Sequence, residues 1–252
     1  AANEEMVRDF CEAIKQLSPP QASVEKISYA EVTSILYKNF SIKQSGKSEI
    51  TSLPVTPDFA ICEDCVKELF DHTNRRHLYP FLTCTRCGPR YSIIRHVPYD
   101  RETTTMDSFK MCPDCLNEYN HPPDRRFYSQ TNSCQKCMIH LFLYNREGKL
   151  VSQDGQQILD LVNSALLEEK IIAIKGIGGY LLMTDASSGP AIRMLRERKQ
   201  RPTKPFALMY PDPATADRDA EINEKITGSW LSPECPIVLC SLREKYDPEL
   251  QI

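Results

Sequence analysis

The sequence lacks the features that would place it in a membrane, outside the cell or on nucleic acid. It has no run of roughly eighteen or more apolar residues, which excludes a helix long enough to span a bilayer. Its first residues, Ala-Ala-Asn-Glu-Glu, have neither the basic nor the apolar region of a secretory signal peptide. A formal net charge of −3 argues against a general attraction to nucleic acid. We therefore expect a cytoplasmic protein with no membrane partner.

Histidine and glycine are scarce. The 252 residues include five histidines, the last of which is His140, and nine glycines against eighteen prolines. The residues after His140 therefore contain no imidazole for a metal ligand or a general base, and carboxylates would have to take those roles. The many prolines indicate fixed turns. The 41% hydrophobic and 26% charged content is ordinary for a globular protein of one or two domains.

Cysteine is abundant, and its arrangement reveals a duplicated unit. Two C-x2-C pairs with eighteen residues between them occur twice, and equivalent residues lie fifty positions apart. The match extends to Glu68 and Glu118 and to the arginine pairs at 75–76 and 125–126. We infer two copies of one unit, each with a complete set of ligands. The predicted metal ligands are Cys62, Cys65, Cys84, Cys87, Cys112, Cys115, Cys134 and Cys137.

This spacing is typical of structural zinc. Two residues between thiolates let a tight turn aim both sulfurs at one metal, and two such turns complete a tetrahedron with Zn–S distances of about 2.3 Å. Four protein thiolates leave no open position for a substrate, so each site stabilises the fold. Disulfides suit secreted chains instead, and iron–sulfur clusters usually have three cysteines closer together. We predict two structural zinc ions, with Cys11, Cys235 and Cys240 left as reduced thiols.

The predicted finger module, residues 51–140, has the wrong charge for nucleic acid. Residues 58–137 include eleven basic and eleven acidic side chains, and eight thiolates outweigh the four positive charges of two zinc ions. The loaded module carries about −4 by formal count, which opposes binding to a phosphate backbone. The two arginine pairs are therefore expected to bind carboxylates inside the module. Ordinary packing or surface roles are expected for its histidines, His72, His77, His96 and His121.

The segment before the module, residues 1–50, predicts a helix followed by two extended segments. Its apolar residues recur at helical spacing up to a pair of prolines, and they are Met6, Phe10, Ile14 and Leu17. The extended segments lie at 24–29 and 36–42, and 44–48 resembles a linker. A segment of this size is too small for an independent core.

The segment from 141 to 252 has an α/β pattern. Apolar residues between 158 and 166 follow helical spacing. The apolar run at 171–174 has the length of a strand that is buried on both faces. The elements predicted after it are a strand at 180–184, a helix capped by Ser188, a strand at 206–209, a polar helix near 214–226 and a strand at 236–240.

Two features of this last segment suit a phosphate ligand. The first is a turn after the 171–174 strand, where backbone N–H groups and a lysine can face an anion, and it comprises Lys175, Gly176, Gly178 and Gly179. The second is a run of six basic residues and one acid between 193 and 204, whose predicted phosphate contacts are Lys199, Arg201 and Lys204. A plain tight turn and a solvated helix face are the alternatives.

Longer motifs add a family resemblance. Tyr79-Pro-Phe-Leu-Thr-Cys-Thr-Arg-Cys-Gly-Pro-Arg-Tyr-Ser-Ile-Ile94 and Asp124-Arg-Arg-Phe127 closely resemble the carbamoyltransferase HypF family of hydrogenase maturation factors. Ala173-Ile-Lys-Gly-Ile-Gly-Gly179 and Arg198-Lys-Gln-Arg-Pro-Thr-Lys-Pro-Phe-Ala207 resemble the YrdC-like domain that follows the fingers in that family. The resemblance covers essentially the whole chain. It implies a small multidomain α+β protein, with two tandem four-cysteine zinc fingers followed by part of an α/β YrdC-like domain.

The resemblance also implies chemistry. In that family, carbamoyl phosphate is activated with ATP and Mg²⁺ as carbamoyl-adenylate, and the carbamoyl group passes to the C-terminal cysteine of a partner maturation protein. There it becomes the cyanide ligand of the iron in nickel–iron hydrogenase. Residues 1–50 then correspond to the end of an acylphosphatase-like domain without its phosphate loop, and residues 141–252 to part of the YrdC-like domain. We expect such a chain alone not to complete the transfer.

Two other functions stay open at this point. The chain has Leu181 and Tyr128 where the family usually has histidine, and Met138 follows the last cysteine where glycine is usual. Leu181, together with the shortened acylphosphatase-like and YrdC-like domains, favours a non-catalytic, zinc-stapled interaction or scaffold protein. A nucleic-acid-binding zinc protein is the third possibility, and the negative charge of the module disfavours it.

Overall fold

The computed structural model describes residues 4–19, 22, 24–30, 55–137 and 139–243. Near the N-terminus it has the predicted helix, α1 (Glu4–Gln16), whose apolar stripe faces solvent: Met6 is 53% exposed and Phe10 is 66% exposed. The predicted strand at 24–29 is irregular. The segment at 36–42 and the linker at 44–48 lie outside the described residues.

The finger module contains two equivalent halves. Helices α2 (Glu63–Phe70) and α3 (Pro113–Asn120) start fifty positions apart, each directly after the first cysteine of its repeat. Leu78 and Tyr128, also fifty positions apart, both have left-handed backbone, with φ of 54° and 55°. Such φ values are uncommon for side chains of this size. The sequence repeat is therefore a repeat of backbone conformation as well.

The connection between the two repeats is fastened to the second one. It forms two 3-10 turns, η1 (Arg101–Thr103) and η2 (Thr105–Ser108). The Arg101 guanidinium donates to the carbonyls of Gln130 at 2.7 Å and Asn132 at 3.1 Å. The third such turn of the module lies outside this connection: η3 (Gln135–Cys137) directly follows the third ligand of the second repeat and contains the fourth. Through Arg101 the connection is therefore tied to the segment just before the third ligand of the second repeat.

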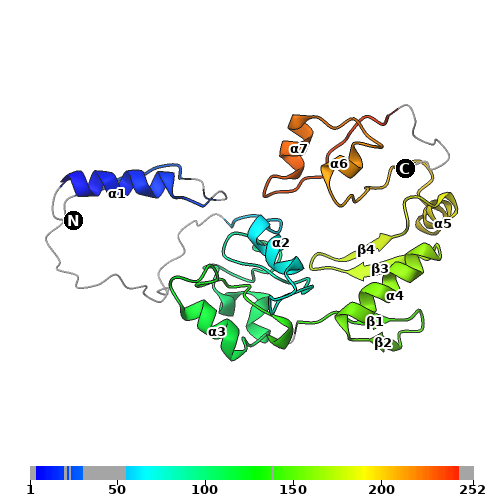
Figure 1. Ribbon diagram of the computed structural model, residues 1–252, viewed down its shortest axis with the longest axis horizontal. Coiled ribbons are helices and arrows are strands. Elements are labelled where there is room, and N and C mark those ends of the chain that lie inside the picture. The colour runs from blue at the N-terminus through cyan, green and yellow to red at the C-terminus, as the bar shows by residue number, and fades with distance from the viewer. Residues whose placement is uncertain (1–3, 20–21, 23, 31–54, 138, 244–252) are drawn as a thin grey trace.

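After the module the chain forms two small antiparallel hairpins and a helix (Figure 1). β1 (Leu143–Tyr144) pairs with β2 (Leu150–Ser152), and β3 (Ile172–Lys175) pairs with β4 (Tyr180–Met183). Between them lies α4 (Gly155–Leu167), whose N-cap Asp154 accepts a hydrogen bond from the Gln157 amide at 2.8 Å. The helix predicted from the 158–166 pattern and both strands of the second hairpin are confirmed.

One expectation about this hairpin is wrong. The apolar run at 171–174 predicts a strand that is buried on both faces, but Ala173 and Ile174 are exposed. Within the described residues, β3 pairs with β4 and contacts α4, but this packing leaves Ala173 and Ile174 exposed. A continuous apolar run indicates burial only when neighbouring elements supply both covering layers.

The C-terminal part contains the predicted Ser188-capped helix and two shorter ones. Ser188 accepts a hydrogen bond from the Ala191 amide at 3.2 Å at the start of α5 (Gly189–Lys199). The single polar helix expected near 214–226 is instead two helices, α6 (Pro213–Ala216) and α7 (Glu224–Trp230).

The two strands predicted in this part do not form. Residues 206–209 and 236–240 are irregular, and Met209, Ile237 and Leu239 are 95%, 84% and 92% exposed. An apolar run becomes a strand only where a partner strand accepts its backbone hydrogen bonds, and the described residues provide none here. None of the described helices is both long and apolar enough to cross a membrane.

Candidate functional site

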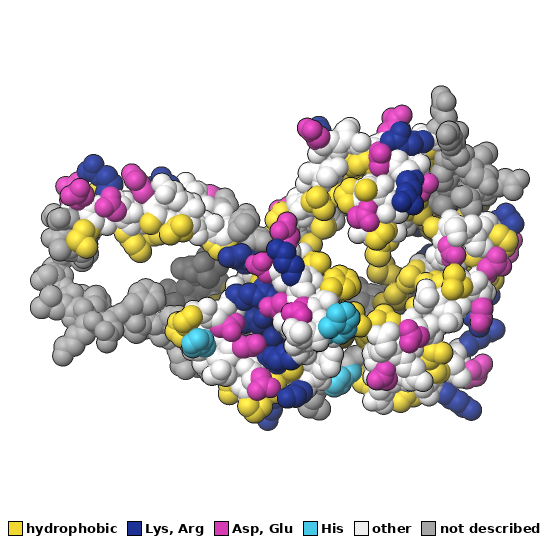
Figure 2. Space-filling model, viewed as in Figure 1, with side chains coloured by type: hydrophobic (Ala, Val, Ile, Leu, Met, Phe, Trp, Pro, Cys, Tyr) yellow, Lys and Arg dark blue, Asp and Glu magenta, His cyan; other side chains and the backbone are white. Residues whose placement is uncertain are grey.

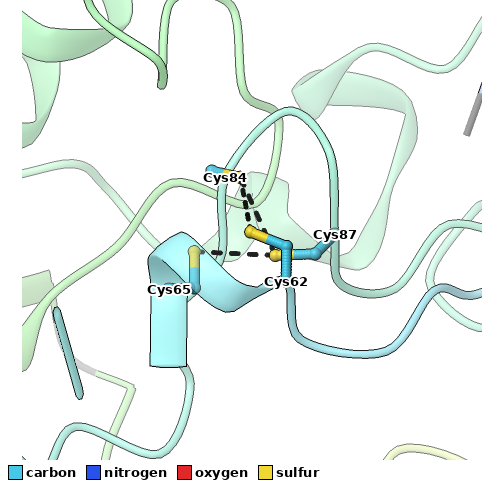
Figure 3. A group of neighbouring side chains, drawn as sticks. All are labelled: Cys62, Cys65, Cys84 and Cys87. Carbon is cyan, nitrogen blue, oxygen red and sulfur yellow. Dashed lines mark hydrogen bonds between the residues drawn. The ribbon is translucent and has the colours of Figure 1, made fainter. Parts of the chain in front are cut away.

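Four cysteines of the first repeat converge from two pieces of chain (Figure 3). Cys62 is the N-cap of α2, Cys65 lies in its first turn, and the other pair comes from the following loop. The Sγ atoms of Cys62 and Cys84 are 3.6 Å apart, those of Cys84 and Cys87 are 3.8 Å apart, and those of Cys65 and Cys87 are 3.6 Å apart. All but Cys62 are buried.

The second repeat reproduces this arrangement. Cys112 is the N-cap of α3, and Cys115 lies in its first turn. The Sγ of Cys134 is 3.6 Å from that of Cys112 and 3.9 Å from that of Cys137. In each repeat the four Sγ atoms lie within 4.8 Å of one another, and neither set includes a cysteine of the other repeat. The prediction of two separate ligand sets, one in each repeat, is therefore confirmed.

The distances fit zinc and exclude disulfides within the two sets. Four sulfurs placed tetrahedrally about 2.3 Å from a common centre are about 3.8 Å from one another, whereas disulfide sulfurs are about 2.05 Å apart. The amides of Arg86 and Lys136, fifty positions apart, each donate to the third cysteine of their repeat at 3.4 Å. Such donors stabilise thiolates, which are the form that binds metal.

The arginine pairs cross from one repeat to the other. The Arg75 and Arg76 guanidinium groups lie 2.7 Å and 2.5 Å from a carboxylate oxygen of Glu118, and Arg76 is 2% exposed. Burial raises the pKa of the Glu118 carboxyl, but the hydrogen bonds and charges of Arg76 and Arg75 lower it to about 2. Glu118 is therefore ionised at neutral pH and neutralises part of the buried positive charge.

The second arginine pair makes the equivalent contacts in the opposite direction. Arg125 lies 2.8 Å from a carboxylate oxygen of Glu68, and Arg126 forms an ion pair with the same carboxylate. The expectation that both pairs bind carboxylates inside the module is confirmed. The sequence reasoning missed that each carboxylate belongs to the other repeat, because a shared period does not distinguish contacts within a repeat from contacts between repeats.

Gly88, directly after the fourth cysteine of the first repeat, occupies a position that only glycine fits. Its φ is +93°, and an added Cβ would lie 2.5 Å from Cγ2 of Thr83. We expect Gly88→Ala to reduce the free energy of unfolding of the zinc-loaded protein by about 1 to 3 kcal/mol, because it combines backbone strain with a clash. Urea unfolding measures this. The matched control is Gly155→Ala, since nothing lies within 4 Å of that Cβ position; equal effects would contradict the argument.

The structure places the predicted phosphate-binding residues in two separate groups. The glycine turn is the tip of the β3–β4 hairpin, closed by a hydrogen bond from the Gly176 amide to the Gly179 carbonyl at 2.8 Å. The Lys175 ammonium donates to the Gly176 carbonyl at 3.2 Å and lies over the Tyr180 ring. In Figure 1 this tip and the basic segment after α5 lie at opposite ends of the hairpin. The described residues therefore do not bring the two groups together.

The basic segment after α5 is held by its own Arg201 and by Arg196 of α5. Arg201 donates to the carbonyls of Lys204 at 3.3 Å and Pro205 at 2.7 Å. Arg196, which is 8% exposed, donates to the carbonyls of Arg201 at 3.1 Å and Lys204 at 3.0 Å and lies over the Phe206 ring. Arg201 thus contacts its own loop, where a phosphate contact was predicted. Sequence reasoning also missed the role of Arg196, although helical spacing from Ile192 indicates its buried position.

Comparison with known proteins identifies the family. The HypF finger model matches residues 61–94 and 111–144, which contain the two cysteine sets. A model for Sua5, YciO and YrdC proteins, described as telomere recombination, matches residues 164–250. The carbamoyltransferase HypF of Rhodobacter capsulatus is 39% identical over 236 residues, which is 93% of this chain and 31% of that protein. The chain belongs to the HypF family.

Other HypF proteins agree. The carbamoyltransferase HypF of Synechocystis sp. is 38% identical over 97% of this chain and 32% of that protein. A full-length HypF solved in a phosphate- and nucleotide-bound form superposes with a TM-score of 0.83, at 39% identity, over 92% of this chain and 30% of that one. HypF of T. kodakarensis superposes with a TM-score of 0.78, at 34% identity, over 99% of this chain and 31% of that one. The chain spans about a third of the length of these HypF relatives.

The HypF comparison confirms the predicted fold class, two tandem four-cysteine zinc fingers followed by an α/β YrdC-like region. Every predicted phosphate-binding residue lies inside the second matched segment. The exposed apolar surface of β3 and β4 lies in the same segment, and this surface includes Leu181, which is 67% exposed.

Proposed function

We propose that this chain is the zinc-finger and YrdC-like part of a carbamoyltransferase. The complete reaction would activate carbamoyl phosphate with ATP as carbamoyl-adenylate and transfer the carbamoyl group to the C-terminal cysteine of a hydrogenase maturation partner. The observation that carries this proposal is the joint match: two four-cysteine sets and the α/β region superpose together on a nucleotide-bound HypF. Either part alone would show a fold without a function.

In this proposal the zinc ions stabilise the protein and take no part in the reaction. The first zinc is held by Cys62, Cys65, Cys84 and Cys87, and the second by Cys112, Cys115, Cys134 and Cys137. Bound zinc supplies folding free energy here, because four thiolates leave no position for a substrate.

The anionic groups of ATP, with its Mg²⁺, and of carbamoyl phosphate would be neutralised by the YrdC-like part. Lys175 and the amides of Gly178 and Gly179 form one positive group at the tip of the hairpin, where the Gly176 amide closes the turn by donating to the Gly179 carbonyl. Lys199, the last residue of α5, and Lys204, in the loop after it, form another. Positioned cations stabilise phosphate charge more strongly than mobile ones. In this structure Arg201 and Arg196 position the loop that carries Lys204, so we assign Arg201 to loop positioning until a ligand draws it away.

The proposed division of labour follows the boundaries predicted from the sequence. Residues 51–140 form the zinc module, residues 141–252 contribute to nucleotide binding, and residues 1–50 belong to the acylphosphatase-like part. Because the chain aligns with 31% of the Rhodobacter capsulatus protein, we expect that this segment alone does not complete the carbamoyl transfer.

The second candidate is a non-catalytic scaffold protein stabilised by zinc. The observation that favours it is Leu181, an apolar and largely exposed residue at a position where the family usually has histidine. A nucleic-acid-binding role has weaker support, because each arginine pair is engaged by a carboxylate of the other repeat.

A chimera separates the two candidates. This chain would replace its 236-residue equivalent in the Rhodobacter capsulatus HypF, and carbamoyl-phosphate-dependent ATP–pyrophosphate exchange would be measured. We expect exchange to persist and Lys204→Ala to reduce it about 10- to 100-fold, the effect of losing one contact to a charged group. Lys149→Ala, in the exposed turn of the first hairpin, should leave it unchanged. A folded, zinc-loaded chimera without exchange would favour the scaffold.

A further inference from the structure

The two thiolate sets have an unusual source of compensating charge. A zinc ion with four thiolates has a formal charge of −2, and nearby donors or cations stabilise such a site. The Arg75 guanidinium of the first repeat donates to Cys115 Sγ of the second at 3.3 Å, and that of Arg76 does so at 3.5 Å. In the opposite direction, Arg125 donates to Cys65 Sγ at 3.3 Å.

Each buried arginine also joins the two halves of the other repeat's ligand set. Arg76 binds Glu118, one helical turn after Cys115 on α3, and its Nε donates at 2.8 Å to the carbonyl of Ser133, the residue before Cys134. Arg126 binds Glu68 on α2 in the same way, and its Nε donates at 3.0 Å to the carbonyl of Thr83, the residue before Cys84. One side chain thus holds both cysteine pairs of the opposite site in register.

Other basic residues of the module do not make these contacts. Arg86 and Lys136, at equivalent positions of the two repeats, form exposed ion pairs with Asp64 and Asp114 of their own repeat. The four crossing arginines instead line a shared hollow of about 660 Å³ together with Glu68 and Glu118. Figure 2 shows basic and acidic side chains intermingled over the finger module.

We propose that each repeat supplies the outer contacts that hold the other repeat's metal site together, so that the two sites gain and lose zinc as a coupled pair. Loss of zinc from the first site releases the start of α2 and with it Glu68, the carboxylate that Arg125 and Arg126 need. Those arginines belong to the second repeat, and the same argument applies in reverse. Changes in such outer contacts typically alter metal affinity 10- to 100-fold.

The test measures which of the two sites loses zinc at the lower chelator concentration. The zinc-loaded chain would be titrated with a chelator, the freed cysteines alkylated, and each peptide quantified by mass spectrometry. Arg125→Met removes a cation that touches Cys65, and Arg75→Met removes one that touches Cys115. Arg86→Met and Lys136→Met are the matched controls, since they remove exposed charges from equivalent positions.

The expected pattern is crossed. Arg125→Met should make the cysteines of the first repeat reactive at about 10- to 100-fold lower chelator concentration, and Arg75→Met should do the same for the second repeat, while both controls stay near the parent. Earlier release from the substituted repeat than from the opposite one, or a chelator concentration unchanged from the parent for both repeats, would overturn the assignment.

A ligand substitution tests the coupling itself. Cys112→Ser weakens the second site directly, and coupling predicts that the chelator concentration that frees the cysteines of the first repeat also falls, by about tenfold or more. An unchanged first site would show that the two zinc ions are independent. Circular dichroism of each zinc-loaded variant, compared with the parent, identifies any variant that has simply unfolded, and Cys62→Ser then provides the reciprocal measurement.

Discussion

Removing zinc is expected to unfold residues 55–137, because each site loses on the order of 10 kcal/mol of folding free energy. The reason is the composition of the core: of the buried hydrophobic residues in this stretch, the cysteines are the majority, and the apolar remainder is Tyr79, Leu82, Ile93 and Met106. So small an apolar core does not offset the entropy of ordering the chain. Amide hydrogen exchange with and without a chelator measures the loss, segment by segment.

The rest of the chain provides an internal control for this experiment. Helices α4 and α5 contain no predicted ligand, so their amides should keep their protection when zinc is removed. In the same assay Cys65→Ser should lower protection throughout the first repeat, whereas Cys235→Ser should not, because that thiol is exposed and outside both sets. Finger amides that stay protected without metal would contradict a zinc-dependent fold.

Glu118→Ala is expected to cost about 3 to 5 kcal/mol of unfolding free energy, the range for removing one partner of a buried ion pair. The substitution leaves Arg76 buried without its carboxylate, and Arg75 loses the same partner. The pKa of Glu118 is lowered to about 2 in the folded protein. Its contribution to the free energy of unfolding is therefore fully present at pH values above the pKa of an unfolded glutamate, and it is lost as the pH falls toward about 2. Denaturant unfolding of the zinc-loaded protein at neutral pH measures the cost.

Asp114→Ala is the matched control for Glu118→Ala. Asp114 lies on the same helix, α3, and pairs with Lys136, but both side chains are more than half exposed. An exposed ion pair of this kind contributes little to stability, so the free energy of unfolding should change by no more than about 0.5 kcal/mol. Similar losses for the two substitutions would show that burial of the arginine pair is unimportant.

The metal sites could be predicted from the sequence because their geometry is local. Two residues between cysteines fix a turn, and the period of fifty assigns each pair to its own copy. The capped helices after Asp154 and Ser188 are local in the same sense, since each cap binds an amide three residues ahead. Local patterns of this kind can be recognised without knowledge of the tertiary fold.

The contacts that could not be predicted from the sequence depend on residues far apart in the chain. The sequence does not show that Arg76 pairs with Glu118 rather than with Glu68, because the two glutamates occupy equivalent positions of the two repeats. The run at 236–240 has strand composition, yet without a partner strand in the described structure it stays irregular. Likewise, the basic run around Arg201 predicts a phosphate contact, but its guanidinium donates to the carbonyls of Lys204 and Pro205 in its own loop.

The most direct test of the account is a metal count on protein purified without added metal. Native mass spectrometry combined with elemental analysis should find two zinc ions per chain, with all eight ligand cysteines reduced, as the sulfur distances require. Alkylation of the unfolded chain after chelation would then label those eight thiols together. One zinc per chain, an iron–sulfur absorption spectrum, or a mass lower by the hydrogens lost in disulfides would contradict the assignment of two structural zinc sites.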